Sequence, residues 1–188
     1  MSFDLISSAA EFIPTAVRLL LFILPAYIAN AAPVLLGGHF PIDGGRRAWD
    51  GRPIFGPSKT WLGLAAGLAA GSLAAVLEAH LLRSTSFDLW SGQAMWYVSS
   101  GVALSAGAML GDLAGSFIKR RMQVKAGQQS LLLDQLPFLF FALAAAGLLG
   151  IVFVFEPLPL LFLVAVTLVL HRSANAFAHA SGIKRVPW

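Results

Sequence analysis

The sequence predicts an all-α integral membrane protein with about five transmembrane helices, folded as a single domain over residues 1–188. Of the 188 residues, 57% are hydrophobic and 12% are charged, whereas a soluble domain carries about twice that charged fraction. The mean hydropathy is +0.76. The chain contains no cysteine, so disulfides, thiolate metal sites and a cysteine nucleophile are excluded. At this length, several spans leave no room for a separate soluble domain.

Five apolar segments have the length of about 20 residues that a helix needs to cross a membrane. They cover residues 12–36, 61–82, 94–117, 134–155 and 157–175. The first contains Pro14, Pro25 and Pro33, which we expect to kink the helix and to free carbonyl groups that neighbouring helices must satisfy. The last two segments are separated only by EPLP at residues 156–159, which indicates a tight hairpin.

Basic residues are concentrated in alternate connections. Those of loop 1 (residues 37–60), loop 3 (residues 118–133) and the C-terminal tail are Arg46, Arg47, Arg52, Lys59, Lys119, Arg120, Arg121, Lys125, Lys184 and Arg185. Arg83 is the single basic residue in the N-terminus, the loop at residues 83–93 and the EPLP turn taken together. Because Lys and Arg are enriched on the cytoplasmic side of membrane proteins, the sequence predicts an external N-terminus, long cytoplasmic loops 1 and 3, and a cytoplasmic C-terminus.

One carboxylate, Asp112, lies within the third apolar segment, in GDLAGSFIKRR. On a helix, Asp112, Ser116 and Lys119 share one face, with Arg120 at its edge. A carboxylate in a membrane span is costly and indicates a functional site by default. A polar contact between spans, or a salt bridge to Lys119 or Arg120, also explains it.

A second carboxylate, Asp134, begins the fourth segment in LLLDQLPF. A helix N-cap, with Pro137 in the first turn, is the commonest role for an Asp in that position. Two carboxylates at the cytoplasmic ends of neighbouring spans, surrounded by Lys and Arg, also have the composition of a Mg²⁺ and polyphosphate site. Mg²⁺ is typically held by one or two carboxylates and by substrate phosphates, and basic residues neutralise the remaining charge.

Loop 1 is rich in Gly and Pro and far longer than a turn requires. It ends in Gly56-Pro57-Ser58-Lys59-Thr60 directly before the second span, where amides and hydroxyls at a helix N-terminus favour phosphate. The stretch is not a P-loop, which needs GxxxxGK[ST]. Taken alone, it is explained more simply by an N-cap at Ser58 or Thr60, with Lys59 as a topology determinant.

The function class has two interpretations. Intramembrane Asp, Asn and His side chains are compatible with a small transporter or channel. A transporter places polar groups near the bilayer midplane and often has repeated halves, whereas here they gather at one face and no internal repeat is found. An enzyme is therefore favoured.

Motifs along nearly the whole chain resemble one family. They are PAYIANAAP in the first span, PIDGGR and DGRPIFGPSKTWLG in loop 1, GDLAGSFIKRR, LLDQLPF, and the ending HRSANAFAHASGIKRVPW. They are similar to those of the CDP-archaeol synthases, the archaeal relatives of the bacterial CDP-diacylglycerol synthases. The resemblance implies Mg²⁺-dependent transfer of CMP from CTP to an isoprenoid ether lipid phosphate, 2,3-di-O-geranylgeranylglyceryl phosphate, with release of pyrophosphate.

The same resemblance implies partners and a location. The partners are CTP, the lipid phosphate and membrane lipid, with no nucleic acid, and the location is the cell membrane with the active site facing the cytoplasm. A homo-oligomer is compatible with the sequence.

Site residues carry over position by position. The bacterial signature places Asp, Ser, Lys and Arg where Asp112, Ser116, Lys119 and Arg120 stand, and its later metal-binding Asp corresponds to Asp134. The implied catalytic residues are Asp112, Lys119, Arg120 and Asp134, of which Asp112 and Asp134 hold the metal, and the implied nucleotide-binding residues are Ser58, Lys59, Thr60, Ser116 and Lys125.

The chain also departs from the bacterial pattern. That pattern has an Asp directly after the lysine that matches Lys125, followed by Gly-His-Gly-Gly, whereas this chain reads Lys125-Ala126-Gly127. Any metal ligand from that stretch is therefore absent. Among other polar residues, Glu78 and His80 are interpreted as structural, and His171 and Asn175 are candidates for a headgroup or nucleotide contact.

Overall fold

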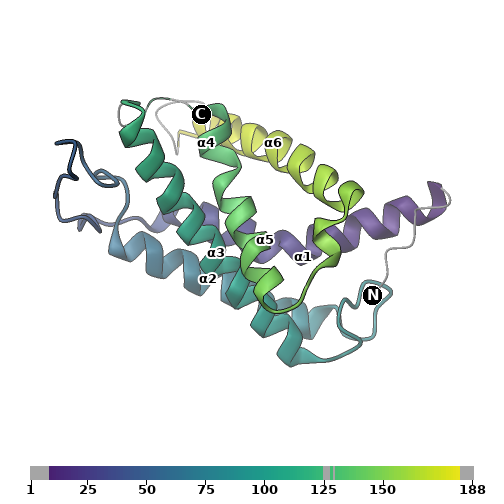
Figure 1. Ribbon diagram of the computed structural model, residues 1–188. Helices are drawn as coiled ribbons and strands as arrows, with labels where there is room; N and C mark the ends of the chain where they lie inside the picture. Colours follow the sequence, from purple (N-terminus) through teal and green to yellow (C-terminus); the bar gives the residue numbers. More distant parts are fainter. Residues whose placement is uncertain (1–8, 125–127, 129, 183–188) are drawn as a thin grey trace.

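The computed structural model describes residues 9–124, 128 and 130–182, and this part of the chain is helical (Figure 1). Its helices are α1 (Ala9–Leu36), α2 (Trp61–Leu81), α3 (Ala94–Arg121), α4 (Leu131–Gln135), α5 (Pro137–Leu148) and α6 (Pro157–Ala180), with a 3-10 turn, η1 (Phe153–Phe155), before α6. Within the described ranges, extended pairing is confined to isolated bridges in loop 1. The prediction of an all-α fold is confirmed.

Among the described residues, four helices have the length and composition to cross a membrane: Phe12–Leu36, Trp61–Leu81, Ala94–Arg121 and Pro157–Ala180. They correspond to the first, second, third and fifth predicted segments. The fourth predicted segment, residues 134–155, is not a single long helix but is divided among α4, α5 and η1. At 1.5 Å per residue, the 12 residues of α5 cover about 18 Å, less than the hydrocarbon core of about 30 Å.

The breaks around α5 have local causes. Pro137 has no N–H to continue α4 and its ring would clash with the preceding turn, so α4 ends at Gln135 and Pro137 opens α5. At the other end, Gly150 adopts a positive φ of 81°. The N–H groups of Gly150 and Ile151 donate to the carbonyls of Gly147 and Ala146, which is the Schellman arrangement that terminates helices.

Helix α3 is the centre of the bundle and packs against α1, α2 and α5. A row of glycines lets α5 approach closely: Gly107 lies against Phe141 and Gly111 against Phe138, so the two helices are antiparallel. The buried core around this contact contains Ile23 of α1, Leu104 and Ala108 of α3, and Leu139 and Leu143 of α5. Small residues that allow close backbone contact are the usual means of packing helices in membranes.

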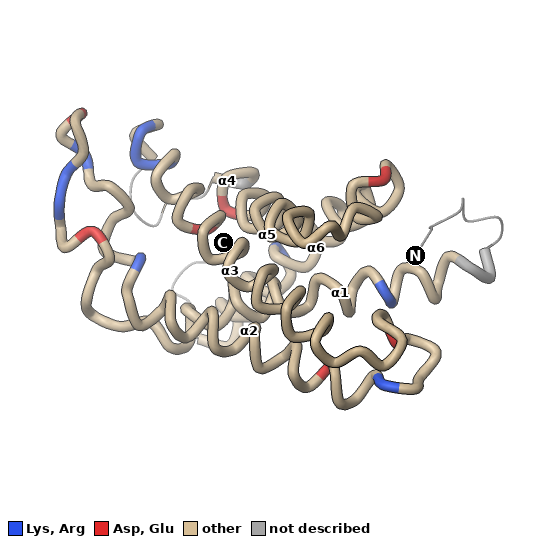
Figure 2. The backbone as a smooth tube through the Cα atoms, turned by 60° about the horizontal axis from the view of Figure 1, so that its bottom comes forward, with Lys and Arg blue, Asp and Glu red and all other residues tan. Residues whose placement is uncertain are grey.

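The two ends of the bundle differ in charge. Loop 1, the last turn of α3 and α4 lie together at one end, which we call the basic end, and Figure 2 shows the Lys and Arg positions of loop 1 and α3 gathered there. The loop between α2 and α3 and the turn before α6 lie at the opposite end (Figure 1). Arg18 of α1 donates to the carbonyl of Ser86 in that loop at 2.7 Å. The predicted separation of basic and less basic loops is therefore reproduced in space.

Loop 1 is organised around the buried carboxylate of Asp43, which is 6% exposed. Asp43 accepts hydrogen bonds from the N–H groups of Gly45 at 3.0 Å, Phe55 at 3.0 Å and Gly56 at 2.9 Å. Burial by itself would raise the pKa of Asp43, but these three donors favour the ionised form and together hold the pKa below its ordinary value. One carboxylate thus joins both ends of the loop.

Thr60 completes the loop where α2 begins. It is the N-cap of α2, and its hydroxyl oxygen accepts the N–H groups of Gly63 at 3.1 Å and Gly38 at 3.2 Å. The N-cap interpretation is therefore confirmed for Thr60, whereas Ser58 lies in the exposed turn before it. Both anchors, Asp43 and Thr60, hold the backbone on either side of Lys59.

We expect Gly111→Ala to destabilise the bundle. Its new Cβ would lie within 3 Å of backbone atoms of Pro137 and Phe138, and overpacking of this kind costs about 1–3 kcal/mol. The gain in helix propensity of about 1 kcal/mol does not offset a collision with backbone. The measurement is the thermal transition of the detergent-solubilised protein. Val102→Ala, at an exposed position of the same helix, is the control, and an unchanged transition in the Gly111 variant would contradict the close contact.

We expect Asp43→Ala to open loop 1, because three N–H groups lose their acceptor. Each group left without a partner costs about 1–3 kcal/mol, and trypsin should then cleave faster at Arg46 and Arg47. Since folding lowers this pKa, the stabilisation is complete at neutral pH and is lost only as the pH falls below the ordinary Asp range. Asp88→Ala is the matched control: Asp88 accepts N–H groups in the opposite loop. Equal cleavage of loop 1 in both variants would refute this role of Asp43.

Candidate active site

The first feature of the basic end is an ion pair between Lys59 and Asp112. Lys59 Nζ donates to Asp112 Oδ1 at 2.7 Å and to Oδ2 at 2.6 Å, and the two side chains are 20% and 27% exposed. The pair joins the end of loop 1 to α3 at Asp112, where the last third of that helix begins. The predicted salt bridge from Asp112 to Lys119 or Arg120 is therefore not the one that forms in the described structure.

The second feature is an ion pair between Lys119 of α3 and Asp134 of α4. The other oxygen of Asp134 accepts the N–H of Ser130 at 2.8 Å. Asp134 is not an N-cap, so that interpretation is wrong: α4 begins after Ser130 and α5 after Leu136. The helix starts earlier than the sequence predicts, which places Asp134 inside α4 with its carboxylate turned back to the cap residue.

Helix α3 presents the predicted face between these two pairs. Asp112 and Lys119 stand two turns apart, and Ser116 lies between them, 3% exposed. The helix continues to Arg121, one turn beyond the predicted span, so Lys119 and Arg120 are held on a helix and not in a loop. The face predicted from spacing is thereby assembled with partners from loop 1 and α4.

Arg120 lies beside the turn at Gly56. A Cβ placed on Gly56 would be 4.0 Å from both Cδ and Nε of Arg120. The Nε of Arg120 is buried and has no hydrogen-bond partner among the residues that the structure describes. A buried guanidinium donor without an acceptor is costly, so this position favours an anionic ligand.

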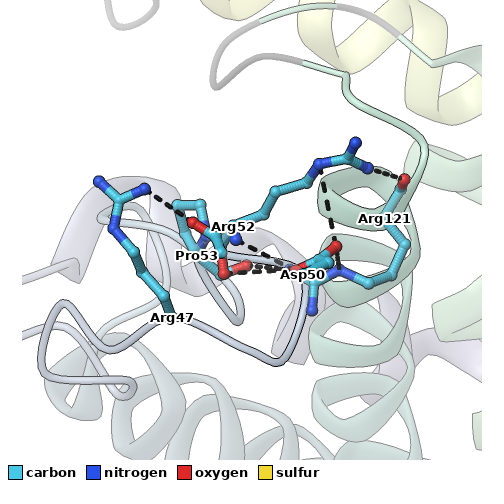
Figure 3. Close-up of polar contacts among 6 residues, drawn as sticks. Arg47, Asp50, Arg52, Pro53 and Arg121 are labelled. Carbon is cyan, nitrogen blue, oxygen red and sulfur yellow. Dashed lines mark hydrogen bonds and ion pairs between the residues drawn. The ribbon is translucent and has the colours of Figure 1, made fainter.

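A clamp of charged residues holds loop 1 against the end of α3 (Figure 3). Arg121 pairs through Nε with Asp50 at 3.0 Å and donates through Nη2 to the carbonyl of Pro53 at 2.5 Å. Arg52 donates in return to the carbonyl of Arg121 at 2.5 Å. The Arg121 guanidinium also lies over the Phe117 ring, 4.8 Å from its centroid.

The clamp was not predicted from the sequence. Arg52 and Arg121 are 69 residues apart in the sequence. Nothing in the local patterns DGR and KRR indicates that these two segments are in contact. The clamp nevertheless brings loop 1 over the last turn of α3, beside Lys119 and Arg120.

The charges of the basic end fit a polyanion. Its described cations are Arg46, Arg47, Arg52, Lys59, Lys119, Arg120 and Arg121, and its described carboxylates are Asp43, Asp50, Asp112 and Asp134. Cations thus outnumber carboxylates at this end. A small cavity of about 30 Å³ is lined there by Ser58, Lys59, Thr60 and Asp112 together with Gly63 and apolar residues.

The donor set for a metal is small. Over the described residues, no group of three or more His, Cys, Asp or Glu side chains is positioned to hold a metal ion. Asp112 and Asp134 supply carboxylate oxygens, which suit Mg²⁺, an ion that is commonly held by one or two carboxylates with substrate phosphates completing its shell. The residues therefore fit a metal that arrives with a polyphosphate.

The remaining predicted residues lie in different places. Lys125 lies outside the described residues. His171 of α6 lies near the start of α5, its ring 6.1 Å from that of Phe138. Glu78 is buried in the last turn of α2, at the end opposite to the ion pairs.

The chain is similar to known proteins over nearly its whole length. The family described as CarS-like, CDP-archaeol synthase, matches residues 12–188. The CDP-archaeol synthase of Thermococcus gammatolerans is 45% identical over 167 residues, which cover 89% of this chain and 93% of that protein. That of Hyperthermus butylicus is 43% identical over 175 residues, covering 93% and 97%.

A solved structure also matches. It is described as an intramembrane enzyme for archaeal membrane lipids biosynthesis, with a TM-score of 0.72 and 42% sequence identity over 83% of this chain and 91% of that chain. These matches do not favour the transporter or channel alternative. Because they extend over most of both chains at more than 40% identity, the chain belongs to the CDP-archaeol synthase family of enzymes.

Proposed function

We propose that this chain transfers CMP from CTP to an isoprenoid ether lipid phosphate, 2,3-di-O-geranylgeranylglyceryl phosphate, forming CDP-archaeol and pyrophosphate. The observation that carries the proposal is the pairing of Asp112 and Asp134 with two lysines at the basic end of a membrane bundle. Membership of the family supplies the reaction class. The residues supply a site whose charge suits a triphosphate.

The reaction does not require a covalent intermediate with the protein. An oxygen of the lipid phosphate attacks the α-phosphorus of CTP, and the bond from that phosphorus to the bridging oxygen breaks as pyrophosphate leaves. A phosphate monoester is largely dianionic near neutral pH, since its second pKa is about 6. No side chain has to be activated as a nucleophile, so positioning and charge stabilisation suffice.

The basic side chains take the positioning role. Lys59 and Lys119 reach the triphosphate from two helix ends, and Arg120 offers its Nε beside the turn at Gly56. Ser58 and Ser116 add hydroxyl donors, while Thr60 holds the turn as the cap of α2. Lys125 is assigned to the same nucleotide side.

Asp112 and Asp134 would hold Mg²⁺. The bound ion would neutralise charge on the phosphate oxygens and on the leaving pyrophosphate. Asp112 would supply carboxylate oxygens from α3 and Asp134 from α4. This chain has no counterpart of the metal ligand in the loop-3 stretch of the bacterial pattern.

We further propose that the chain crosses the membrane five times, with α4, α5 and η1 together forming the short fourth crossing. Loops 1 and 3 and the C-terminus then face the cytoplasm and the N-terminus faces outside, in agreement with the excess of Lys and Arg at the basic end. CTP is soluble in water, so the site must open at this face. The lipid substrate reaches it from between the helices.

The orientation is tested with reporters. A reporter fused after Trp188 or inserted near Gly45 should read cytoplasmic, and one at the N-terminus or near Gly92 should read external. The measurement is the activity of compartment-specific fusion enzymes in intact cells. A cytoplasmic N-terminus would contradict the five-crossing arrangement.

The reaction is tested with purified protein, labelled CTP and the ether lipid phosphate. Asp112→Asn and Asp134→Asn keep the size of each side chain but remove its charge, so each should lower turnover by at least about 100-fold, the scale of losing one electrostatic stabiliser. Both variants should still elute from size exclusion as folded protein.

Asp88→Asn, at the opposite end, is the control and should keep near-normal turnover. Normal turnover in the Asp134 variant would remove that residue from the metal set. Equal transfer from ATP and CTP by the parent protein would contradict the cytidylyltransferase proposal itself.

A further inference from the structure

The carboxylates proposed to hold Mg²⁺ are already occupied by donors from the chain. Both oxygens of Asp112 accept from Lys59, one oxygen of Asp134 accepts from Lys119, and the other accepts the N–H of Ser130. A metal ion that binds these oxygens therefore competes with an ammonium group, and the like charge of the two cations disfavours their binding together. The exchange is a property of the chain and does not depend on which nucleotide binds.

The geometry around Lys59 favours such an exchange. The backbone of its turn is held by Asp43 on one side and by the Thr60 cap on the other, whereas its ammonium stands on a flexible four-carbon stem. The cavity of about 30 Å³ that borders Lys59 and Asp112 is large enough for one water-sized group. An ion can enter beside Asp112 while the loop stays in place.

The displaced ammonium needs a new partner. Lys59 is 20% exposed, so it is only partly solvated, and beside a bound cation it would meet a like charge. A triphosphate supplies the anion. Arg120, whose Nε has no acceptor within the described part of the chain, adds a second cation beside the same turn at Gly56.

We propose, resting on the function proposed above, that Lys59 is an internal counter-ion which Mg²⁺ displaces from Asp112, and that the released ammonium binds the triphosphate. Metal and triphosphate then bind with positive coupling, because each relieves the charge that the other leaves unpaired. Without nucleotide, Lys59 keeps the site closed to Mg²⁺. Lys119 and Asp134 form a second pair of the same kind.

The test is Mg²⁺ binding to the detergent-solubilised full chain without nucleotide, measured by titration calorimetry. Lys59→Met removes the competing ammonium and keeps a similar length, so it should bind Mg²⁺ alone at least about 10-fold more tightly than the parent, the scale of one charge-assisted contact. Lys59→Arg, which keeps a cation that can pair with both oxygens, should bind as weakly as the parent.

Arg120→Met is the matched control. It removes the same charge from the same cluster without freeing a carboxylate, so it should tighten Mg²⁺ binding far less than Lys59→Met. Mg²⁺ affinity in Lys59→Met that equals the parent, or that equals Arg120→Met, would overturn the proposal. Should Lys59→Met not fold, Lys119→Met frees Asp134 and carries the same expectation.

The reciprocal measurement is CTP binding in EDTA and at saturating Mg²⁺. The gain from Mg²⁺ should fall in Lys59→Met by at least the factor by which Mg²⁺ binding alone has tightened, because the variant has also lost the ammonium that binds the triphosphate in the presence of Mg²⁺. An unchanged gain would also overturn the coupling. If the parent transfers CMP but Lys59→Met binds Mg²⁺ no better, only this inference fails; if Lys59→Met binds Mg²⁺ tightly but the parent transfers no CMP, the proposed function fails and the ion exchange stands.

Discussion

The contact on which the rest of the site depends is the ion pair between Lys59 and Asp112. A carboxylate in a membrane helix is tolerated only with a partner, and in this chain the partner comes from a loop 53 residues earlier. To deliver it, loop 1 must turn back over the end of α3. Two other devices enforce that path: Asp43 joins the two ends of the loop, and Arg121 clamps its middle to α3.

This arrangement separates rigid backbone from movable charge. The turn before α2 is fixed by buried hydrogen bonds and a helix cap, and α3 is fixed by glycine contacts against α5. The lysine ammonium groups are the parts with rotational freedom, since each stands at the end of a four-carbon chain. A site of this kind can exchange internal ion pairs for ligand without moving helices, which matters in a bundle whose packing tolerates little change in volume.

Sequence patterns predicted the parts of this structure that are local. Hydropathy located α1, α2, α3 and α6, and charge bias separated the two ends of the bundle, because both are properties of single segments. Spacing also placed Asp112, Ser116 and Lys119 on one face of α3. The sequence correctly predicted Pro137 in the first turn of a helix. It did not predict the short helix before Pro137, with Ser130 as its cap, because a five-residue helix has no periodicity to detect.

The same patterns did not predict which residues pair with one another across the fold. Asp112 has three basic residues within three turns on its own helix, and local spacing favoured two of them. The true partner follows from the path of loop 1. Asp43 shows the same limit, since a buried acceptor of three backbone N–H groups is recognised only when Gly45, Phe55 and Gly56 are brought around it. Pairings set by tertiary structure are not encoded in the spacing of either partner.

The proposed polyphosphate site contains two carboxylates, and their presence there needs an explanation. A triphosphate is repelled by Asp112 and Asp134, so in a site made only to attract it these residues would weaken binding, and Asn would serve better. They are useful if a cation stands between them and the phosphates. In the structure the neighbouring cations are the ammonium groups of Lys59 and Lys119. They neutralise the carboxylates, but they belong to the chain itself. A divalent ion can bridge carboxylate and phosphate oxygens together, which a single ammonium with three donors does less well. Under the proposed exchange the lysines would then pair with phosphate, so the same positive charges would stabilise the protein before the ligands bind and the ligands afterwards.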